Sequence, residues 1–390
     1  QPHMELTSRQ FLLQFGHVTQ QELFPLLEES LGPLSPQLRL LASLAALMPL
    51  ERLLSARRAH TGLPAKDRAA LAMAFAAKAV LNLPTTRDLI GRLRADPALR
   101  QLCGWQSQRG LPHESKFSRA FAEFASTQLP QQLHEAVVKT TQGQRLIGHI
   151  ARDSTAIAVR EHFPDRPVAK KKRKGKRGRR KGVTDGQLRA KASQRGTRLQ
   201  RQRHQKIKEM LAGLSTECSL GVKKGSQGHQ HYWRGYKLHL DVADGQVPIS
   251  AILTSASVHD SQVAIPLMTM TSERVTHLYE LMDSAYDADP IHEHIRQGGR
   301  VPIIATHGRR GTKKPSKLTK AFPVKLPPEL CWAKKDRFKE RTMIERVNAR
   351  LKDEFGASQI RVRGALKVMA HLMFGVLVLT VDQWQKLAVQ

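Results

Sequence analysis

Apolar positions in the first 145 residues recur every three to four residues. Stretches such as "PLSPQLRLLASLAALMPLERLL", "LPAKDRAALAMAFAAKAVLNL" and "ESKFSRAFAEFASTQL" show this spacing, which is that of one face of a helix. Thr85 and Asp88 fit a capping box, and Asp96 followed by Pro97 fits a helix cap and first turn. We therefore predict an all-helical N-terminal domain over residues 1–145.

From residue 146 the apolar period changes to two. "RLIGHIARDSTAIAV" reads as a strand with Asp153 near its end, and "GYKLHLDVADGQVPISAILTSAS" as a hairpin that turns at Asp244-Gly245. "RVTHLYELMDSAYDA" predicts a strand carrying Asp283, "IHEHIRQGGR" a helix and "RVPIIATH" a strand. Two helices close the chain, one with Glu345 and one from about 364 to 388. The expected fold class is α/β, a mixed sheet flanked by helices.

Basic residues interrupt this pattern between the first strand and the hairpin. Residues 168–225 hold 20 Lys and Arg against 3 Asp and Glu, so they contribute 17 of the 31 net positive charges of the chain. Like charges at this density repel one another, so we expect residues 168–225 to be a partly disordered insertion. Its densest part has ten bases within residues 170–181: Lys170, Lys171, Lys172, Arg173, Lys174, Lys176, Arg177, Arg179, Arg180 and Lys181. Such a tract predicts contact with the phosphate backbone of nucleic acid, and its alternative is a solubility or localisation segment.

The three cysteines, Cys103, Cys218 and Cys331, are each more than a hundred residues apart, which excludes a CxxC zinc site and a disulfide framework. The longest apolar run, "LMFGVLVLTV", has about half the roughly 20 residues that span a bilayer. The first ten residues lack the basic start and apolar centre of a signal peptide. We therefore expect a cytoplasmic protein without a membrane partner.

Asp153, Asp283 and Glu345 stand out as acids on this cationic background. Acids that end neighbouring strands lie at one edge of an open sheet, and a helix packed across that edge can add a third carboxylate. Such a cluster repels itself when empty, and Mg²⁺ relieves the repulsion by binding carboxylates together with waters and substrate phosphate oxygens. For each acid alone, surface solvation or a helix cap is the alternative.

In "FKERTMIERVNARLK", Phe338, Arg341, Glu345 and Lys352 are spaced by three, four and seven residues, so they share one helix face. A solvated helix with internal ion pairs is the simplest explanation. The strands that carry Asp153 and Asp283, together with this helix, nevertheless resemble the DDE transposases of bacterial insertion sequences. Those proteins have an RNase H-like catalytic core and the helix signature Tyr-x2-Arg-x3-Glu-x6-Lys.

The resemblance implies roles for individual residues. Asp153, Asp283 and Glu345 would be the catalytic metal-binding triad, holding Mg²⁺, or Mn²⁺ in its place, with two ions per site. Arg341 and Lys352 would face the DNA backbone near the scissile phosphate. Phe338 stands where the signature has Tyr, which removes one hydroxyl from the site. Only 61 residues separate Asp283 from Glu345, too few for the large β-rich insertion of some relatives, so no hairpin-forming cleavage step is implied.

The resemblance also implies a domain division and a function. The expected division is a helical N-terminal domain at 1–145 for packing, DNA-end binding or dimerisation, a catalytic domain at 146–167 and 226–390, and the basic insertion at 168–225. The expected function is cleavage at the terminal inverted repeats and joining of the 3′-OH to target DNA. It would be performed by a homodimer or higher oligomer associated with the nucleoid. The alternatives are an inactive DNA-binding relative and a nuclease that hydrolyses without joining.

Weaker candidates surround this site. His259 and Asp260 in "SASVHDSQ" are expected to hydrogen-bond around the triad, and Asp260 is an alternative metal ligand. Trp233 could stack on a base, although a packing role is favoured. His292 and His294 are expected on a surface helix rather than on a metal, and Gly225, Gly228 and Gly235 form no phosphate-loop pattern.

Overall fold

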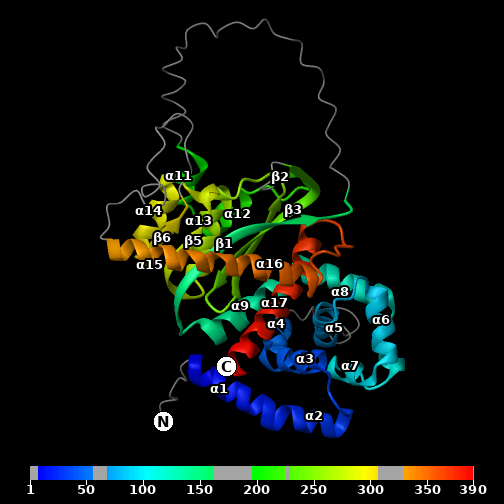
Figure 1. The fold of residues 1–390 in the computed structure, drawn as a ribbon. Helices are drawn as coiled ribbons and strands as arrows, with labels where there is room; N and C mark the ends of the chain where they lie inside the picture. Colours follow the sequence, from blue (N-terminus) through cyan, green and yellow to red (C-terminus); the bar gives the residue numbers. More distant parts are fainter. Residues whose placement is uncertain (1–7, 56–67, 162–195, 225–228, 306–327, 390) are drawn as a thin grey trace, which may run out of the picture.

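A computed structural model describes residues 8–55, 68–161, 196–224, 229–305 and 328–389 of the chain (Figure 1). In the described ranges up to residue 142 the chain is mainly helical, and a mixed sheet with helices on both faces follows. This confirms the predicted fold class, an RNase H-like α/β domain preceded by a helical region. The basic residues at 170–181 lie outside the described residues.

The N-terminal helices pack around a buried central helix, α5 (Arg68–Val80). The helices along this part of the chain are α1 (Ser8–Val18), α2 (Phe24–Leu31), α3 (Pro36–Leu47), α4 (Leu50–Ser55), α5, α6 (Thr86–Ala95), α7 (Pro97–Leu102), α8 (Glu114–Ser126) and α9 (Leu129–Gln142). Both predicted caps are confirmed. Thr85 and Asp88 exchange capping-box hydrogen bonds at the start of α6, and Asp96 accepts from the Leu99 amide at 3.0 Å.

The described residues form a six-stranded sheet in the order β2-β3-β1-β5-β6, with β4 also paired to β3. Its strands are β1 (Leu146–Ala158), β2 (Ser219–Lys224), β3 (Gln230–Ala243), β4 (Val247–Ser255), β5 (Thr276–Met282) and β6 (Val301–Ile304). β1 is antiparallel to β3 and parallel to β5, and β5 is parallel to β6. The central strand β1 therefore joins an antiparallel half of the sheet to a parallel half.

The predicted hairpin is confirmed as β3 and β4, with Ala243 opposite Val247 at the turn. Gly245 and Gln246 in this turn have φ values of 79° and 64°. A left-handed backbone is easy for glycine, which explains why the Asp-Gly pair marks the turn.

The stretch from residue 196 to 224 is folded, and its two short helices agree with the helical pair that the basic sequence after residue 186 predicts. It forms α11 (Arg198–Gln202) and α12 (Ile207–Ala212), which pack on α13 (Ser261–Ser272), and then β2. β2 pairs with the first half of β3, from Ser219 opposite Gly235 to Lys224 opposite Gln230. Residues 219–224, which we assigned to the insertion, are therefore a strand of the sheet.

Two layers of helices cover the sheet (Figure 1). One face packs against α13, which contacts α14 (Asp289–Gln297). The other face packs against α16 (Met343–Asp353) and α17 (Ala365–Val389). α15 (Pro328–Lys339) precedes α16, and a short 3₁₀ turn, Glu340–Thr342, joins the two.

α17 lies at the centre of the molecule and connects its two parts. It contacts α9, α5 and α8 of the helical region as well as β4 of the sheet. Buried residues of α3, α5, α8, β1, β3 and α17 belong to one hydrophobic cluster, so the helical region and this sheet face share a core. α17 has the length and apolar composition of a membrane span, but 67% of its most apolar window is buried inside the protein. The helix therefore reads as the core helix of a folded domain.

Candidate active site

Asp153 lies on β1, and Asp283 directly follows the adjacent parallel strand β5, close enough for its charge to act on the Asp153 carboxyl. The parallel ladder of β1 and β5 pairs Ala151 with Leu281, and two further residues along each strand bring Asp153 level with Asp283. Residues at equivalent positions of a ladder point to the same face, here the face covered by α16 and α17. The prediction that the two carboxylates meet at one edge therefore holds. The predicted position of Asp153 is wrong in one respect, because β1 continues to Ala158 alongside β3.

The environment of Asp153 disfavours its negative charge. Burial is the main cause that raises the pKa of this carboxyl to about 6, and the nearby charge of Asp283 raises it further. A hydrogen bond from the Ser154 amide at 2.7 Å and the charges of Lys223 and Arg341 act in the opposite direction. Within the described part of the chain, neither Asp153 nor Asp283 forms an ion pair. Two half-buried acids that repel each other are a suitable donor set for a hard divalent cation.

Glu345, the third predicted ligand, lies on α16, which contacts both β1 and β3. Its side chain is 57% exposed and pairs at 3.1 Å with Arg341 in the preceding 3₁₀ turn, which is the internal ion pair of the simplest explanation for this segment. The Arg341 guanidinium also lies 5.8 Å from the ring of Phe338, the residue that replaces the signature Tyr. No group of three His, Cys, Asp or Glu residues in the described ranges is arranged to hold a metal ion. The structure therefore brings Asp153 and Asp283 together and turns Glu345 toward Arg341.

Lys352 and Lys223 add positive charge near the two acids. Lys352 lies near the end of α16, where burial and the charge of Lys223 lower its pKa. Lys223 belongs to β2, and its charge acts on Asp153 as well. Neither lysine forms an ion pair with a described carboxylate. Lys223, whose charge reaches Asp153, and Lys352, whose charge interacts with that of Lys223, form a positive region that suits a phosphate substrate.

His259 and Asp260 follow β4 and occupy the neighbouring edge of the sheet. Asp260 pairs with Lys237 at 3.0 Å and lies 3.9 Å from the His239 ring, whereas His259 is exposed and contacts Ser261 at 2.8 Å. Lys237 therefore partly neutralises the charge of Asp260. Tyr286 is 1% exposed, and its hydroxyl, with no hydrogen-bond partner among the described atoms, lies within the electrostatic field of Asp153, Asp283 and Asp260.

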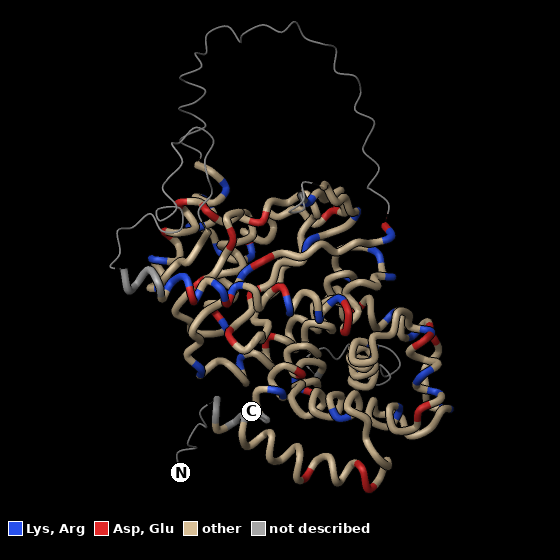
Figure 2. The backbone as a smooth tube through the Cα atoms, viewed as in Figure 1, with Lys and Arg blue, Asp and Glu red and all other residues tan. Residues whose placement is uncertain are grey.

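The opposite face of β1 carries a buried ion-pair network. Arg152 donates to both oxygens of Asp241, at 2.7 and 2.6 Å, and to Glu280 at 2.8 Å. Thr271 donates to Asp241 at 2.6 Å, and Arg300 pairs with Glu280 at 3.0 Å. Figure 2 shows acidic and basic residues close together along the central strands. This network ties β1 to β3 and β5 directly behind Asp153.

Two of the weaker candidates have structural explanations. The Trp233 indole lies against Gly221 of β2, where an added Cβ would meet the ring at 2.3 Å, and its N–H donates to the Tyr236 carbonyl at 3.0 Å. The favoured packing role of Trp233 therefore holds. His292 on α14 contacts Asp287 at 3.1 Å.

Sequence reasoning missed Lys223, Tyr286 and Arg152. Lys223 was hidden in the range assigned to the insertion, and Tyr286 stands in a stretch that we predicted as strand but that forms a 3₁₀ turn after β5. Arg152 had a usable signal, because a charged Arg-Asp pair inside an otherwise apolar strand requires a partner on each face.

Two family comparisons agree with this geometry. A family described as "Transposase DDE domain" matches residues 144–381, and one described as "Transposase domain (DUF772)" matches residues 29–123. No curated protein sequence matched the chain. The first match covers the sheet, Asp153, Asp283 and α16. The chain belongs to the DDE transposases of insertion sequences. Members of this family act on DNA as polynucleotidyl transferases and typically use a divalent metal ion.

Proposed function

We propose that this transposase cuts DNA at the terminal inverted repeats of its element and joins the released 3′-OH to target DNA, with Asp153, Asp283 and Glu345 as catalytic metal ligands. The observation that carries the proposal is the ladder position of Asp153 and Asp283, which gives two half-buried carboxylates on one face with no protein cation bound to them. Glu345 would complete the set by leaving Arg341, because the exposed pair they form is worth only a few tenths of a kcal/mol.

The residues present fit Mg²⁺, or Mn²⁺ in its place, because all three donors are carboxylates and the acids repel one another without it. Bound as a pair, such ions activate an attacking oxygen and stabilise the leaving 3′ oxygen of an in-line phosphoryl transfer. Asp153 and Asp283 fix the direction from which the phosphate approaches. Arg341, released from Glu345, and Lys352 would then bind phosphate oxygens.

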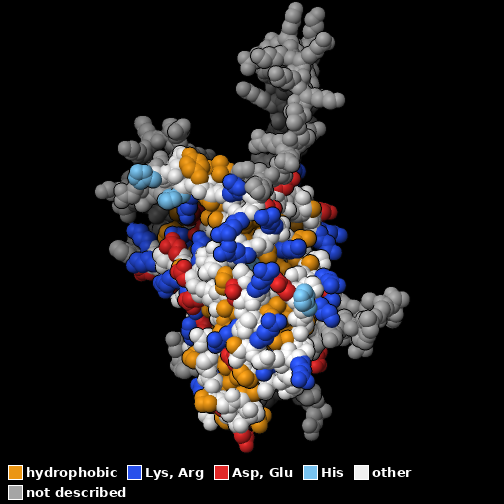
Figure 3. Space-filling view, turned by 90° about the vertical axis from the view of Figure 1, so that its right-hand side faces the viewer, with side chains coloured by type: hydrophobic (Ala, Val, Ile, Leu, Met, Phe, Trp, Pro, Cys, Tyr) orange, Lys and Arg blue, Asp and Glu red, His pale blue; other side chains and the backbone are white. Residues whose placement is uncertain are grey.

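The DNA surface would extend beyond this site. Basic side chains predominate on the side of the molecule shown in Figure 3. The tract at 170–181 supplies ten more bases for backbone contact. We expect a homodimer or higher oligomer on the DNA ends, associated with the nucleoid in the bacterial cytoplasm.

The test is strand transfer by the purified protein from a pre-cleaved terminal repeat into a target plasmid in Mg²⁺. The proposal predicts joined product with the native chain and none with Asp153→Asn, Asp283→Asn or Glu345→Gln, each of which should still bind the repeat. Hydrolysis without joining would identify a nuclease, and binding without either reaction would identify an inactive DNA-binding relative.

A separate experiment tests the basic tract. Deleting residues 170–181 should weaken binding to all DNA sequences and reduce the slope of log affinity against log salt by about 0.9 for each phosphate that the tract neutralises. An unchanged slope would show that the tract does not bind phosphates.

A further inference from the structure

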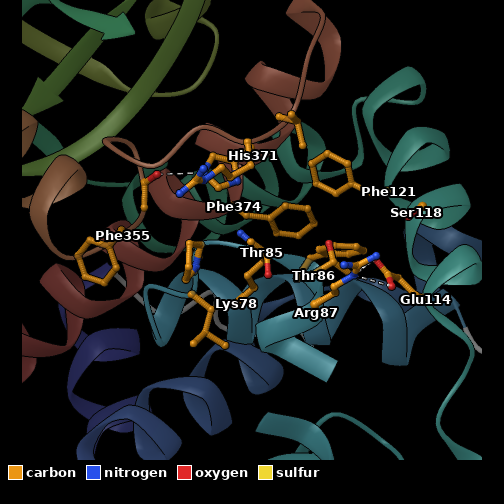
Figure 4. A pocket seen from close by; sticks show the side chains of 17 residues that line it. Lys78, Thr85, Thr86, Arg87, Glu114, Ser118, Phe121, Phe355, His371 and Phe374 are labelled. Atoms are coloured by element: carbon orange, nitrogen blue, oxygen red, sulfur yellow. Dashed lines mark hydrogen bonds and ion pairs between the residues drawn. The ribbon is translucent and has the colours of Figure 1, made fainter. Parts of the chain in front are cut away.

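A cavity lies between the helical region and the C-terminal helices, and we call it the junction pocket. Its volume is about 350 Å³, at the low end of the range for small-molecule sites. Residues from α5, α6, α8, α17 and the α16–α17 connection line it (Figure 4). Those used below are Lys78, Arg87, Glu114, Arg361 and His371, with the rings of Phe75, Phe121 and Phe374. A cavity of this size has room for a ligand as large as one nucleotide.

Lys78 is the most unusual residue in the junction pocket. It is the one charged residue within the buried stretch of α5, it is 8% exposed, and it forms no ion pair with a described carboxylate. Most of the side chain is buried, but Nζ is not among the enclosed unpartnered atoms of the described residues, so the ammonium group is placed where an anion in the pocket could supply the opposite charge. The side chain lines the pocket, so an anion that enters can reach it.

Other groups around the pocket also favour an anion. The first turn of α6, a ten-residue helix, contributes Thr86 and Arg87, and helix N-termini carry partial positive charge. Arg87 is paired with Glu114 at 3.1 Å, as the dashed lines in Figure 4 show, whereas Arg361 is exposed and has no partner among the described residues. Three cations line the pocket against one acid, and Asp88 in the first turn of α6 adds a second negative charge that acts on Lys78, so the surroundings keep an excess of one positive charge.

The junction pocket adjoins the helix that carries Glu345 and Lys352. Asn82, two residues beyond α5, donates to the Asp353 carbonyl at 2.8 Å. Gly356 follows with a φ of 83°, and its carbonyl accepts a hydrogen bond from Nε2 of His371 at 3.0 Å. Burial lowers the pKa of His371 to about 4, and the charge of Lys78 lowers it further, so the ring is neutral and adds no charge. An anion in the pocket would therefore bind where the helical region meets the end of α16.

We propose that the junction pocket binds a nucleotide, with its phosphate on Lys78, Arg361 and the first turn of α6 and its base against the phenylalanine rings. The nucleotide could be an unpaired one in the bound DNA, in which case this inference rests on the proposed function. It could also be free in solution, in which case the inference does not depend on that function. The two sources share the same chemistry and are separated by the choice of probe.

The first experiment titrates deoxyadenosine 5′-monophosphate and, in parallel, deoxyadenosine into the full-length protein, with binding measured by isothermal calorimetry. The nucleotide should bind and the nucleoside should bind at least tenfold more weakly. Lys78→Gln and Arg361→Gln should each weaken the nucleotide at least tenfold, whereas Lys139→Gln should not. Lys139 is the matched control, because it is a lysine of the same helical region but is exposed and paired with Glu135 at 2.7 Å.

The second experiment compares two DNA duplexes, one blunt and one with a single unpaired 5′-phosphorylated nucleotide, by fluorescence anisotropy. A tighter complex with the unpaired nucleotide, abolished in Lys78→Gln but kept in Lys139→Gln, supports the DNA source even if the free nucleotide does not bind. The proposal is overturned if Lys78→Gln binds both probes as the native protein does. Neither experiment needs cleavage or metal, so failure of the transposase proposal would not be mistaken for failure of this one.

The pH dependence of binding gives a readout that a purely structural lysine would not produce. Burial lowers the pKa of Lys78 to about 8, partly offset by Asp88, and the other charged groups nearby are Arg87, Glu114 and Arg361. Because the phosphate needs the charged ammonium, its affinity should fall about tenfold between pH 7 and pH 9. Lys78→Gln should lose this pH dependence while remaining folded, and an equal dependence in both proteins would contradict the assignment.

Discussion

Arg152 and Asp153 are neighbours on β1 and point to opposite faces of the sheet. The two faces differ in whether their charged residues have ion-pair partners. Behind the strand, Arg152 is bonded to Asp241 and Glu280 at 2.6 to 2.8 Å, so both buried acids are paired with a cation. In front of it, Asp153 lies beside Asp283 without an ion pair to any described residue. Both faces contain two acids close together, but only one contains a cation between them.

The pKa values of Glu280 and Asp153 reflect this difference between the two faces of the sheet. Burial alone would raise the pKa of Glu280, but the charge of Arg152, the hydrogen bond and charge of His277, and the charge of Arg300 together lower it to about 2. Burial raises the pKa of Asp153 to about 6, and the charge of Asp283 adds to the increase. Burial raises the pKa of both carboxyls, and only at Glu280 do several positive groups together outweigh it; Asp241, bonded to the same Arg152, keeps a raised pKa because burial is the larger effect there. On the face that carries Asp153, no described residue forms an ion pair with the two acids. This face is therefore the one suited to bind a metal cation.

The largest expected effect comes from removing the internal cation. Arg152→Met should destabilise the protein by about 3–5 kcal/mol, because Asp241 and Glu280 would remain buried without their partner. Urea denaturation followed by circular dichroism measures the change. A loss of stability below about 1 kcal/mol would mean that the ion pairs of Arg152 do not tie β1 to its neighbouring strands as described.

The opposite sign is expected on the other face. The folded-state pKa of Asp153, about 6, lies above its ordinary value of 3.8, so its ionisation costs stability as pH rises from about 4 to 6, and the cost persists above pH 6. Asp153→Asn should therefore stabilise the metal-free protein at pH 7 by up to about 3 kcal/mol and by much less at pH 4. Urea denaturation in EDTA at both pH values tests this. Glu29→Gln, which removes an exposed acid, is the control for net charge.

Binding of Mg²⁺ to the face that carries Asp153 should stabilise the protein. Millimolar Mg²⁺ should raise the unfolding free energy of the native protein by about 1–3 kcal/mol, as expected for a ligand well above its dissociation constant. Removing it with EDTA should reverse the change. Asp153→Asn should lose most of the stabilisation, while Glu29→Gln should keep it. Equal stabilisation of all three proteins would place the cation elsewhere.

The smallest effect on stability is expected at the exposed pair of Arg341 and Glu345. A double-mutant cycle with Arg341→Gln and Glu345→Gln should give a coupling of about 0.3–0.5 kcal/mol, the usual value for exposed pairs four residues apart on a helix. A coupling above about 1.5 kcal/mol would show that Glu345 is bound too tightly to join Asp153 and Asp283.

Local sequence signals predicted much of the fold. The Asp-Gly turn, the capping box at Thr85 and the alternation around Asp153 depend on neighbouring residues, so the sequence contains all that they require. The pairing of Asp153 with Asp283 was also predictable, since parallel strands bring their ends to the same edge.

Features that depend on distant partners were not predictable from one sequence. β2 is short, and Gly221 interrupts its apolar pattern, but that glycine makes room for the Trp233 ring on β3. The strand continues past Asp153 because β3 supplies hydrogen-bond partners up to Gly235. Lys78 was visible as a lone charge in an apolar helix, yet its burial and missing partner become evident only when α5 and α17 are packed together.

Direct measurement of cation binding tests the central claim that Asp153 and Asp283 form a divalent-metal site. Calorimetric titration of the full-length protein with Mn²⁺ should detect binding in the native chain and in Glu29→Gln. Affinity should fall at least tenfold in Asp153→Asn and in Asp283→Asn. Equal Mn²⁺ affinity in all four proteins would contradict the account.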